Sequence, residues 1–159
     1  MTWQPGSERI RRLLDDGQLE QVTPDVEVAR RMLLDAGRHL ATATAAESTG
    51  DLAGAYQLAY DALRKSAVSL LAVQGLRPTS RGGHIALQEA VTAQFGSTIG
   101  VLRSYGRIRR ARNNFEYPSS ETPGPSPDDV TDAVEVATKV RDAAATILQQ
   151  DLLTIWSAE

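Results

Sequence analysis

The stretch DVEVARRMLLDAGRHLATATA, residues 25–45, decides the fold class of this chain. Its apolar residues recur at alternating steps of three and four, which is the spacing of one buried stripe along an α-helix. Thr23 offers a helix cap, and Pro24 suits a first helical turn. The spacing therefore predicts a long helix that ends near Gly50. The residues of the stripe are Val26, Ala29, Leu33, Ala36, Leu40 and Ala43.

Helical spacing continues through most of the remaining chain. A second long helix is predicted over residues 51–75, and the short turn before it makes the two helices antiparallel neighbours. A shorter helix is predicted over 84–96 and another over 97–117. A last helix opens at Asp128, with an apolar stripe that continues to Ile155. No strand pattern is strong enough to build a sheet.

Three segments interrupt this helical pattern. GLRPTSRGG, residues 75–83, is predicted to be an ordered loop because proline and paired glycines break helices. PSSETPGPSP, residues 118–127, holds four of the chain's seven prolines and is predicted to be a stiff crossover. Residues 1–22 form a peripheral segment with a short amphipathic helix over 7–16. We therefore expect residues 1–159 to form a single all-α domain, an up-and-down helical bundle with a short extra N-terminal helix.

Composition excludes several classes of function. The chain has 159 residues, of which 42% are hydrophobic, and this length fits one domain of the usual ~100 to 200 residues. Without cysteine there can be no disulfide, zinc–thiolate site or iron–sulfur ligation, and two histidines are too few for a histidine metal cage. We therefore expect no metal and no cofactor. The sequence has no signal-peptide pattern and no run near the ~18 apolar residues of a membrane span, so we expect a cytoplasmic protein without membrane contact.

Charge is distributed unevenly along the chain. The formal net charge is only −3, which argues against a protein coated in positive charge. Residues 77–112, however, carry seven arginines against the single acid Glu89, a balance of +6. Arginine without lysine suits bidentate phosphate recognition and stacking on bases. The alternative is a solvated helix face whose arginines pair with the acidic last helix, and charge alone does not decide between the two.

The run RIRRARNNFEYP, just before the proline-rich crossover, holds the candidate site. On a helix Arg109, Asn113 and Tyr117 share one face, and Arg112 and Glu116 share an adjacent one. These side chains lie near a helix end, where they can reach a ligand. A purely structural interpretation is also open, in which Arg112 pairs with Glu116, Asn113 caps the helix and Tyr117 closes the edge of the core.

At these residues the sequence resembles the HEPN domains, small helical bundles found in prokaryotic toxin–antitoxin and defence systems. The resemblance rests on AYQLAYDALRKSAVSLLAVQGL, on RPTSRGGH and on RRARNNFEYP. It implies a bundle of HEPN type that forms a homodimer. In ribonucleases of the family, the signature is an arginine followed by a polar residue, with a histidine four to six positions further on. These residues from two subunits meet across the dimer interface and cleave RNA without metal. The arginine stabilises the pentacovalent phosphate and the histidine moves protons.

Residues of this chain match that signature in part. Arg112 and Asn113 match the arginine and the polar residue, but Tyr117 stands five positions beyond Arg112, where the family has histidine. One interpretation is an RNA or nucleotide site, including Arg109, that binds without cleaving. A second is that His84 supplies the imidazole. A third is that Tyr117 accepts a nucleotide from a nucleotidyltransferase, as a tyrosine near the motif does in some family members.

The resemblance therefore implies an RNA-directed, metal-independent endoribonuclease-like toxin or defence effector. Its alternative is a non-catalytic HEPN module that binds a nucleotide, RNA or a protein, and a plain oligomerising scaffold is a third possibility. The expected partners are RNA or a nucleotide, a cognate antitoxin or nucleotidyltransferase, and a second copy of the chain. The candidate catalytic residues are Arg112, Asn113 and Tyr117, and the candidate binding residues are Arg81, His84, Arg109 and Glu116. His84 and Arg81 form an anion cradle in this interpretation, with a loop histidine acting as a helix cap as the structural alternative.

Overall fold

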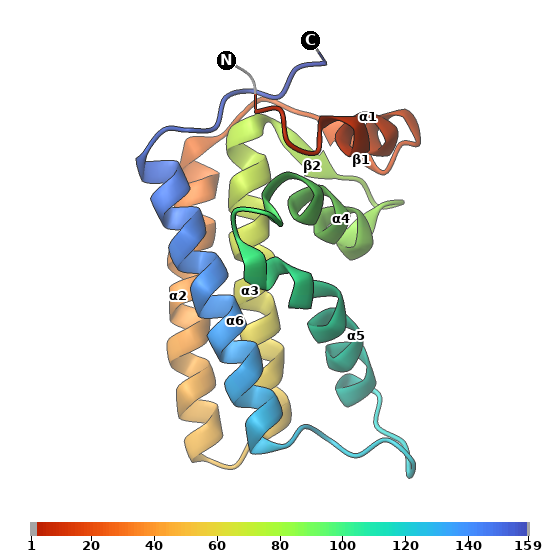
Figure 1. Cartoon of the computed structure of the whole chain (residues 1–159). Coiled ribbons are helices and arrows are strands. Elements are labelled where there is room, and N and C mark those ends of the chain that lie inside the picture. The colour runs from red at the N-terminus through yellow and green to blue at the C-terminus, as the bar shows by residue number, and fades with distance from the viewer. Residues whose placement is uncertain (1–2, 159) are drawn as a thin grey trace.

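The computed structural model describes residues 3–158, and within them the chain folds into six α-helices, one 3₁₀ helix and a small two-stranded sheet (Figure 1). The predicted all-α bundle with a short N-terminal helix is confirmed. In chain order the elements are α1 (Ser7–Asp15), β1 (Leu19–Gln21), α2 (Val26–Ser48), α3 (Leu52–Gln74), β2 (Leu76–Pro78), α4 (Gly83–Phe95), η1 (Gly100–Ser104), α5 (Tyr105–Glu116) and α6 (Pro127–Gln149).

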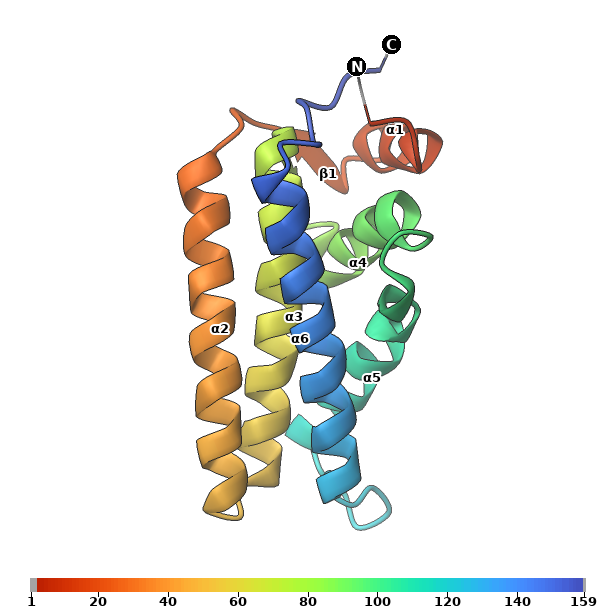
Figure 2. The ribbon, with the colours of Figure 1, turned by 60° about the vertical axis from the view of Figure 1, so that its left-hand side comes forward.

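Three long helices, α2, α3 and α6, lie side by side and form the main body of the bundle (Figures 1 and 2). α2 and α3 are antiparallel, as their short connection predicts. The Asp51 side chain begins α3 by accepting a hydrogen bond from the Gly54 backbone. Ser126 begins α6 with a capping box to Asp129. The buried face of α3 is rich in alanine, so neighbouring helices approach closely; Ala55, Ala59, Ala62 and Ala67 are all fully buried.

The predicted helix over 97–117 is wrong in its first part. The structure has the 3₁₀ helix η1 there, and the α-helix begins only at Tyr105. The buried residues of both pieces fit the predicted stripe, because Ile99, Leu102 and Ile108 are all buried. The apolar spacing therefore identified which residues face the core but not the change in helix type.

The expectation that no sheet forms is also wrong, in a small region. β1 and β2 pair antiparallel over three residues each, with Leu19 opposite Pro78. Strands this short show no alternation that a sequence pattern could reveal. Gly75 precedes β2 with a φ of +72°, and a Cβ there would lie 2.6 Å from the Val22 carbonyl oxygen. This position therefore requires glycine.

Both ends of the described chain lie against the bundle. Ile10 and Leu13 of α1 are buried, and the Trp3 ring lies 5.2 Å from that of Phe95 in α4. The last helix ends at Gln149, so the apolar stripe that was predicted to reach Ile155 is wrong there. Beyond Gln149 the chain is not helical, and Leu153 and Trp156 are buried while Ile155 is exposed. Within residues 3–158 no helix is long and apolar enough to cross a membrane.

Candidate functional site

The side chain of Tyr60 in α3 contacts candidate residues from both α4 and α5. Tyr60 lies in α3 and is fully buried. Its hydroxyl is hydrogen-bonded to Nδ1 of His84 in α4 at 2.7 Å, and the two rings stack with centroids 5.9 Å apart. The guanidinium carbon of Arg112 in α5 lies 5.5 Å from the centroid of the same ring, in cation–π contact. The fold therefore brings His84 and Arg112 into contact with the same aromatic side chain.

Arg112 is held in a fixed orientation by polar groups. Its Nε donates to Oε1 of Gln57 in α3 at 2.6 Å, and its Nη1 donates to Oδ1 of Asn113 at 3.0 Å. Nη1 also pairs with Oε2 of Glu116 at 2.8 Å, as the spacing of four residues predicts. The side chain is only 22% exposed. Nη2 takes part in none of these three contacts.

Arg109 is oriented in the same manner by a second glutamine. Its Nε donates to Oε1 of Gln88 in α4 at 2.9 Å. Gly106 permits this contact, because a Cβ at that position would lie 2.6 Å from Nε2 of Gln88. The close approach of α4 to α5 therefore requires glycine at position 106.

Arg64 is a member of the cluster that the sequence analysis missed. It lies in α3, one turn beyond Tyr60, and pairs with Asp61 at 3.6 Å. Asp61 also accepts a hydrogen bond from Nε2 of Gln57 at 3.2 Å, so Gln57 connects Asp61 to Arg112. The signal available in the sequence was the four-residue step from Tyr60 to Arg64, which places both on one face of α3.

The environment of the cluster shifts the pKa values of two of its groups. Burial is the main cause that lowers the pKa of His84 below its ordinary 6.5, and the nearby Arg64 and Arg112 lower it further. His84 is therefore neutral at pH 7. Burial also raises the pKa of Tyr60, so its hydroxyl stays protonated. Nε2 of His84 makes no hydrogen bond within residues 3–158 and is the ring nitrogen available to a ligand.

Two of the predicted residues lie outside this cluster. Tyr117 directly follows α5 and is 77% exposed, so the structural interpretation in which it closes the edge of the core is wrong. Its backbone N–H donates to the Asn113 carbonyl oxygen at 3.3 Å. Arg81, in the loop before α4, is exposed, and its side chain forms no ion pair in the described part of the chain.

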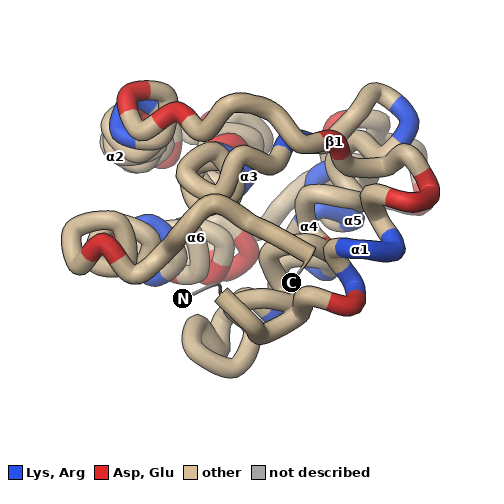
Figure 3. The backbone as a smooth tube through the Cα atoms, turned by 90° about the horizontal axis from the view of Figure 1, so that it is seen from above, with Lys and Arg blue, Asp and Glu red and all other residues tan. Residues whose placement is uncertain are grey.

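The last helix covers little of the arginine block. Arg107 pairs with Asp132 of α6 at 2.8 Å, while Arg77 pairs with Glu20 of β1 at 2.6 Å. None of the ion pairs within residues 3–158 involves Arg109. Figure 3 shows basic segments around α5, beside α4. The block therefore keeps positive charge on the side of the bundle where His84 and Arg112 lie.

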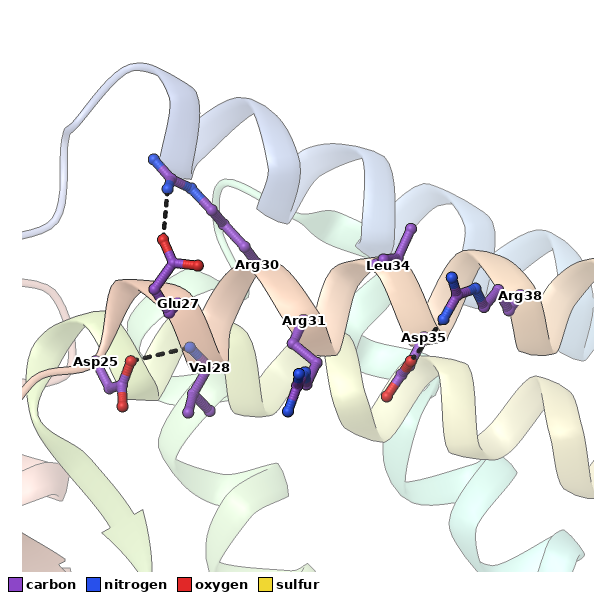
Figure 4. Close-up of a pocket in the computed structure, with 8 residues that line it drawn as sticks. All are labelled: Asp25, Glu27, Val28, Arg30, Arg31, Leu34, Asp35 and Arg38. Carbon is purple, nitrogen blue, oxygen red and sulfur yellow. Dashed lines mark hydrogen bonds and ion pairs between the residues drawn. The ribbon is translucent and has the colours of Figure 1, made fainter.

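A pocket of about 580 Å³ lies on the outer face of α2 and shares no residue with this cluster (Figure 4). Two ion pairs lie within it, Arg30 with Glu27 at 2.7 Å and Arg38 with Asp35 at 3.7 Å. Among residues 3–158 no three histidine, aspartate or glutamate side chains come together in a way that could hold a metal ion.

The class of protein follows from this arrangement: a helical bundle with an arginine–asparagine pair in the last turn of α5. A family model described as HEPN domain matches residues 29–148, which extend from α2 to α6. The chain belongs to the HEPN domain family. The matched range covers most of the chain and leaves out α1 and β1. No curated protein and no solved structure gives a significant match.

Proposed function

We propose that this protein acts on RNA without metal, with Arg112 as the phosphate-binding group and His84 as the imidazole that the signature lacks at position 117. The observation that carries the proposal is the shared contact with Tyr60: a 2.7 Å hydrogen bond to His84 and a cation–π contact at 5.5 Å to Arg112. Both groups belong to one chain. In this proposal Asn113 orients Arg112, and Arg109 and Arg81 extend the cationic surface along the RNA backbone.

The chemistry requires a neutral imidazole and a cation. When Nδ1–H of His84 donates to the Tyr60 oxygen, Nε2 can accept the proton of a ribose 2′-hydroxyl. The 2′-oxygen then attacks phosphorus, and Arg112 stabilises the negative charge of the pentacovalent phosphate. The bond to the 5′-oxygen breaks, and the proton from His84 goes to that leaving oxygen. The products are a 2′,3′-cyclic phosphate and a 5′-hydroxyl end.

A second candidate function is a non-catalytic module that binds RNA or a nucleotide. It is favoured by the ion pair between Oε2 of Glu116 and Nη1 of Arg112 at 2.8 Å, which engages one of the guanidinium nitrogens. It is also favoured by the tyrosine that stands in place of the signature histidine. In this alternative Arg109 and Arg112 bind phosphate and no bond is broken.

The two functions differ in one experiment. A mixed RNA pool is incubated in EDTA with the wild-type protein, with Arg112→Ala and with His84→Gln, and products and bound RNA are measured separately. A matched control is Arg103→Ala, which removes an exposed arginine of the same block outside the cluster. Cleavage by wild type and Arg103→Ala that is lost in both other variants supports the nuclease. Binding that depends on Arg112 without any cleavage supports the module. RNA binding that is absent, or equal in Arg112→Ala and wild type, rejects both.

We also propose that Tyr117 is the residue that a partner nucleotidyltransferase would modify. Its 77% exposure supports this role, because a transferase must reach the hydroxyl. A cognate antitoxin and a second copy of the chain complete the proposed partners. Intact-mass measurement of protein produced together with a nucleotidyltransferase encoded beside its gene tests the modification. A mass increase that persists in Tyr117→Phe would rule out this tyrosine.

A further inference from the structure

A groove of about 310 Å³ lies beside Arg112, between the start of α3 and the end of α5. Its aromatic lining comes from Tyr56 and Phe115, whose rings meet edge to face with centroids 4.9 Å apart at 82°. Ala53 and Pro118 add further apolar surface, and the polar lining residues are Gln57, Arg112 and Glu116.

From these features we infer that the groove binds one unpaired nucleobase of the RNA whose phosphate contacts Arg112. The inference rests on the proposed function, because it names the part of the substrate that lies beside the phosphate. The volume falls at the lower end of the ~300–1,000 Å³ typical of small-molecule sites. Aromatic side chains next to an arginine are the usual platform for an unstacked base and its backbone.

The walls of the groove are suited to a flat aromatic ligand. Tyr56 is 2% exposed, so it supports the ring of Phe115 from within and does not itself contact the base. Burial raises the pKa of Tyr56 to about 12, so its side chain stays uncharged. Phe115 is only partly buried, and its edge-to-face contact with Tyr56 fixes the orientation of its ring. Ala53 is exposed on the first turn of α3 and is small enough to leave the groove open.

One consequence is a preference for single-stranded RNA. A base inside a duplex is stacked and paired, so it cannot enter a groove on the protein without being extruded. An RNA that lacks the base at the bound position keeps its phosphates and loses the stacking contact. Comparison of an intact oligonucleotide with an abasic one therefore measures the groove separately from Arg112.

The experiment uses two fluorescein-labelled single-stranded RNAs of equal length, one intact and one with abasic sites throughout its central part. Binding to the full chain is followed by fluorescence anisotropy. We expect the wild type to bind the intact RNA about fivefold or more tightly than the abasic RNA, in line with the contribution of one stacked base. Ala53→Met, which fills the groove, should abolish this difference. Ala41→Met is the matched control, because Ala41 is an exposed alanine of α2 outside the groove.

The outcomes separate the groove from the proposed function. If Arg112→Ala binds both RNAs as tightly as wild type does, the proposed function fails. If Arg112→Ala weakens both but wild type binds intact and abasic RNA equally, the groove is not a base site and the proposed function stands. The base site is also overturned if Ala53→Met prefers intact over abasic RNA as strongly as Ala41→Met does. The wild-type comparison needs no variant, so it decides the question even if Ala53→Met folds poorly.

Discussion

Replacement of Glu116 by glutamine should strengthen RNA binding, because its carboxylate competes with phosphate for Arg112. The ion pair has an N–O distance of 2.8 Å between side chains that are 22% and 42% exposed. A pair this exposed stabilises by about 0.3–0.5 kcal/mol. In Glu116→Gln a bound phosphate would also escape repulsion by the carboxylate, and this repulsion energy is about 1 kcal/mol for unit charges about 4 Å apart in water. Together these effects predict roughly 8- to 12-fold tighter binding, since 1.4 kcal/mol corresponds to tenfold.

The assay is a fluorescence anisotropy titration of single-stranded RNA at low and moderate salt. Glu121→Gln is the matched control, because it removes the same charge from the exposed crossover at a residue that forms no ion pair in the described chain. We expect tighter binding for Glu116→Gln only, with a gain that shrinks as salt screens the charges. Unchanged affinity would refute competition for Arg112. Weaker binding would instead make Glu116 a direct contact to RNA, which is the role that the sequence suggested.

Two further predictions concern stability. Gln74→Leu should lower the free energy of unfolding by about 2–4 kcal/mol, because it leaves the buried Gln94 amide without the reciprocal bonds of 2.7 and 3.0 Å. Chemical denaturation measures this change. The prediction is contradicted if the double variant, with leucine at both 74 and 94, is no more stable than Gln74→Leu alone. The lowered pKa of His84 means that the unfolded chain binds more protons below pH 6.5, so stability should fall as the pH decreases through that value. In His84→Gln this part of the decrease should disappear, and an identical pH profile would contradict the shift.

How well the sequence predicts a contact in this molecule depends on how far apart the two residues are along the chain. Local spacing predicted α2 and α3 to within a few residues, and it predicted the pairing of Arg112 with Glu116. The bond between Tyr60 and His84 joins residues 24 apart and depends on how α4 crosses α3. No periodic pattern records such a crossing, so His84 could be suspected from its chemistry but not located.

The chemistry of the partners decides how the arginine block can act. A carboxylate that pairs with a guanidinium orients it and cancels its charge, as in the pairing of Arg107 with Asp132. An amide oxygen orients the guanidinium and leaves the charge intact. Arg109 and Arg112 are both oriented by glutamine, through Gln88 and Gln57. Arg109 is thus oriented without a carboxylate partner, and an anionic ligand explains this better than stability does, because a carboxylate would orient the guanidinium equally well. Glu116 is the exception to this pattern at Arg112, and for this reason its replacement is the most direct test of the site.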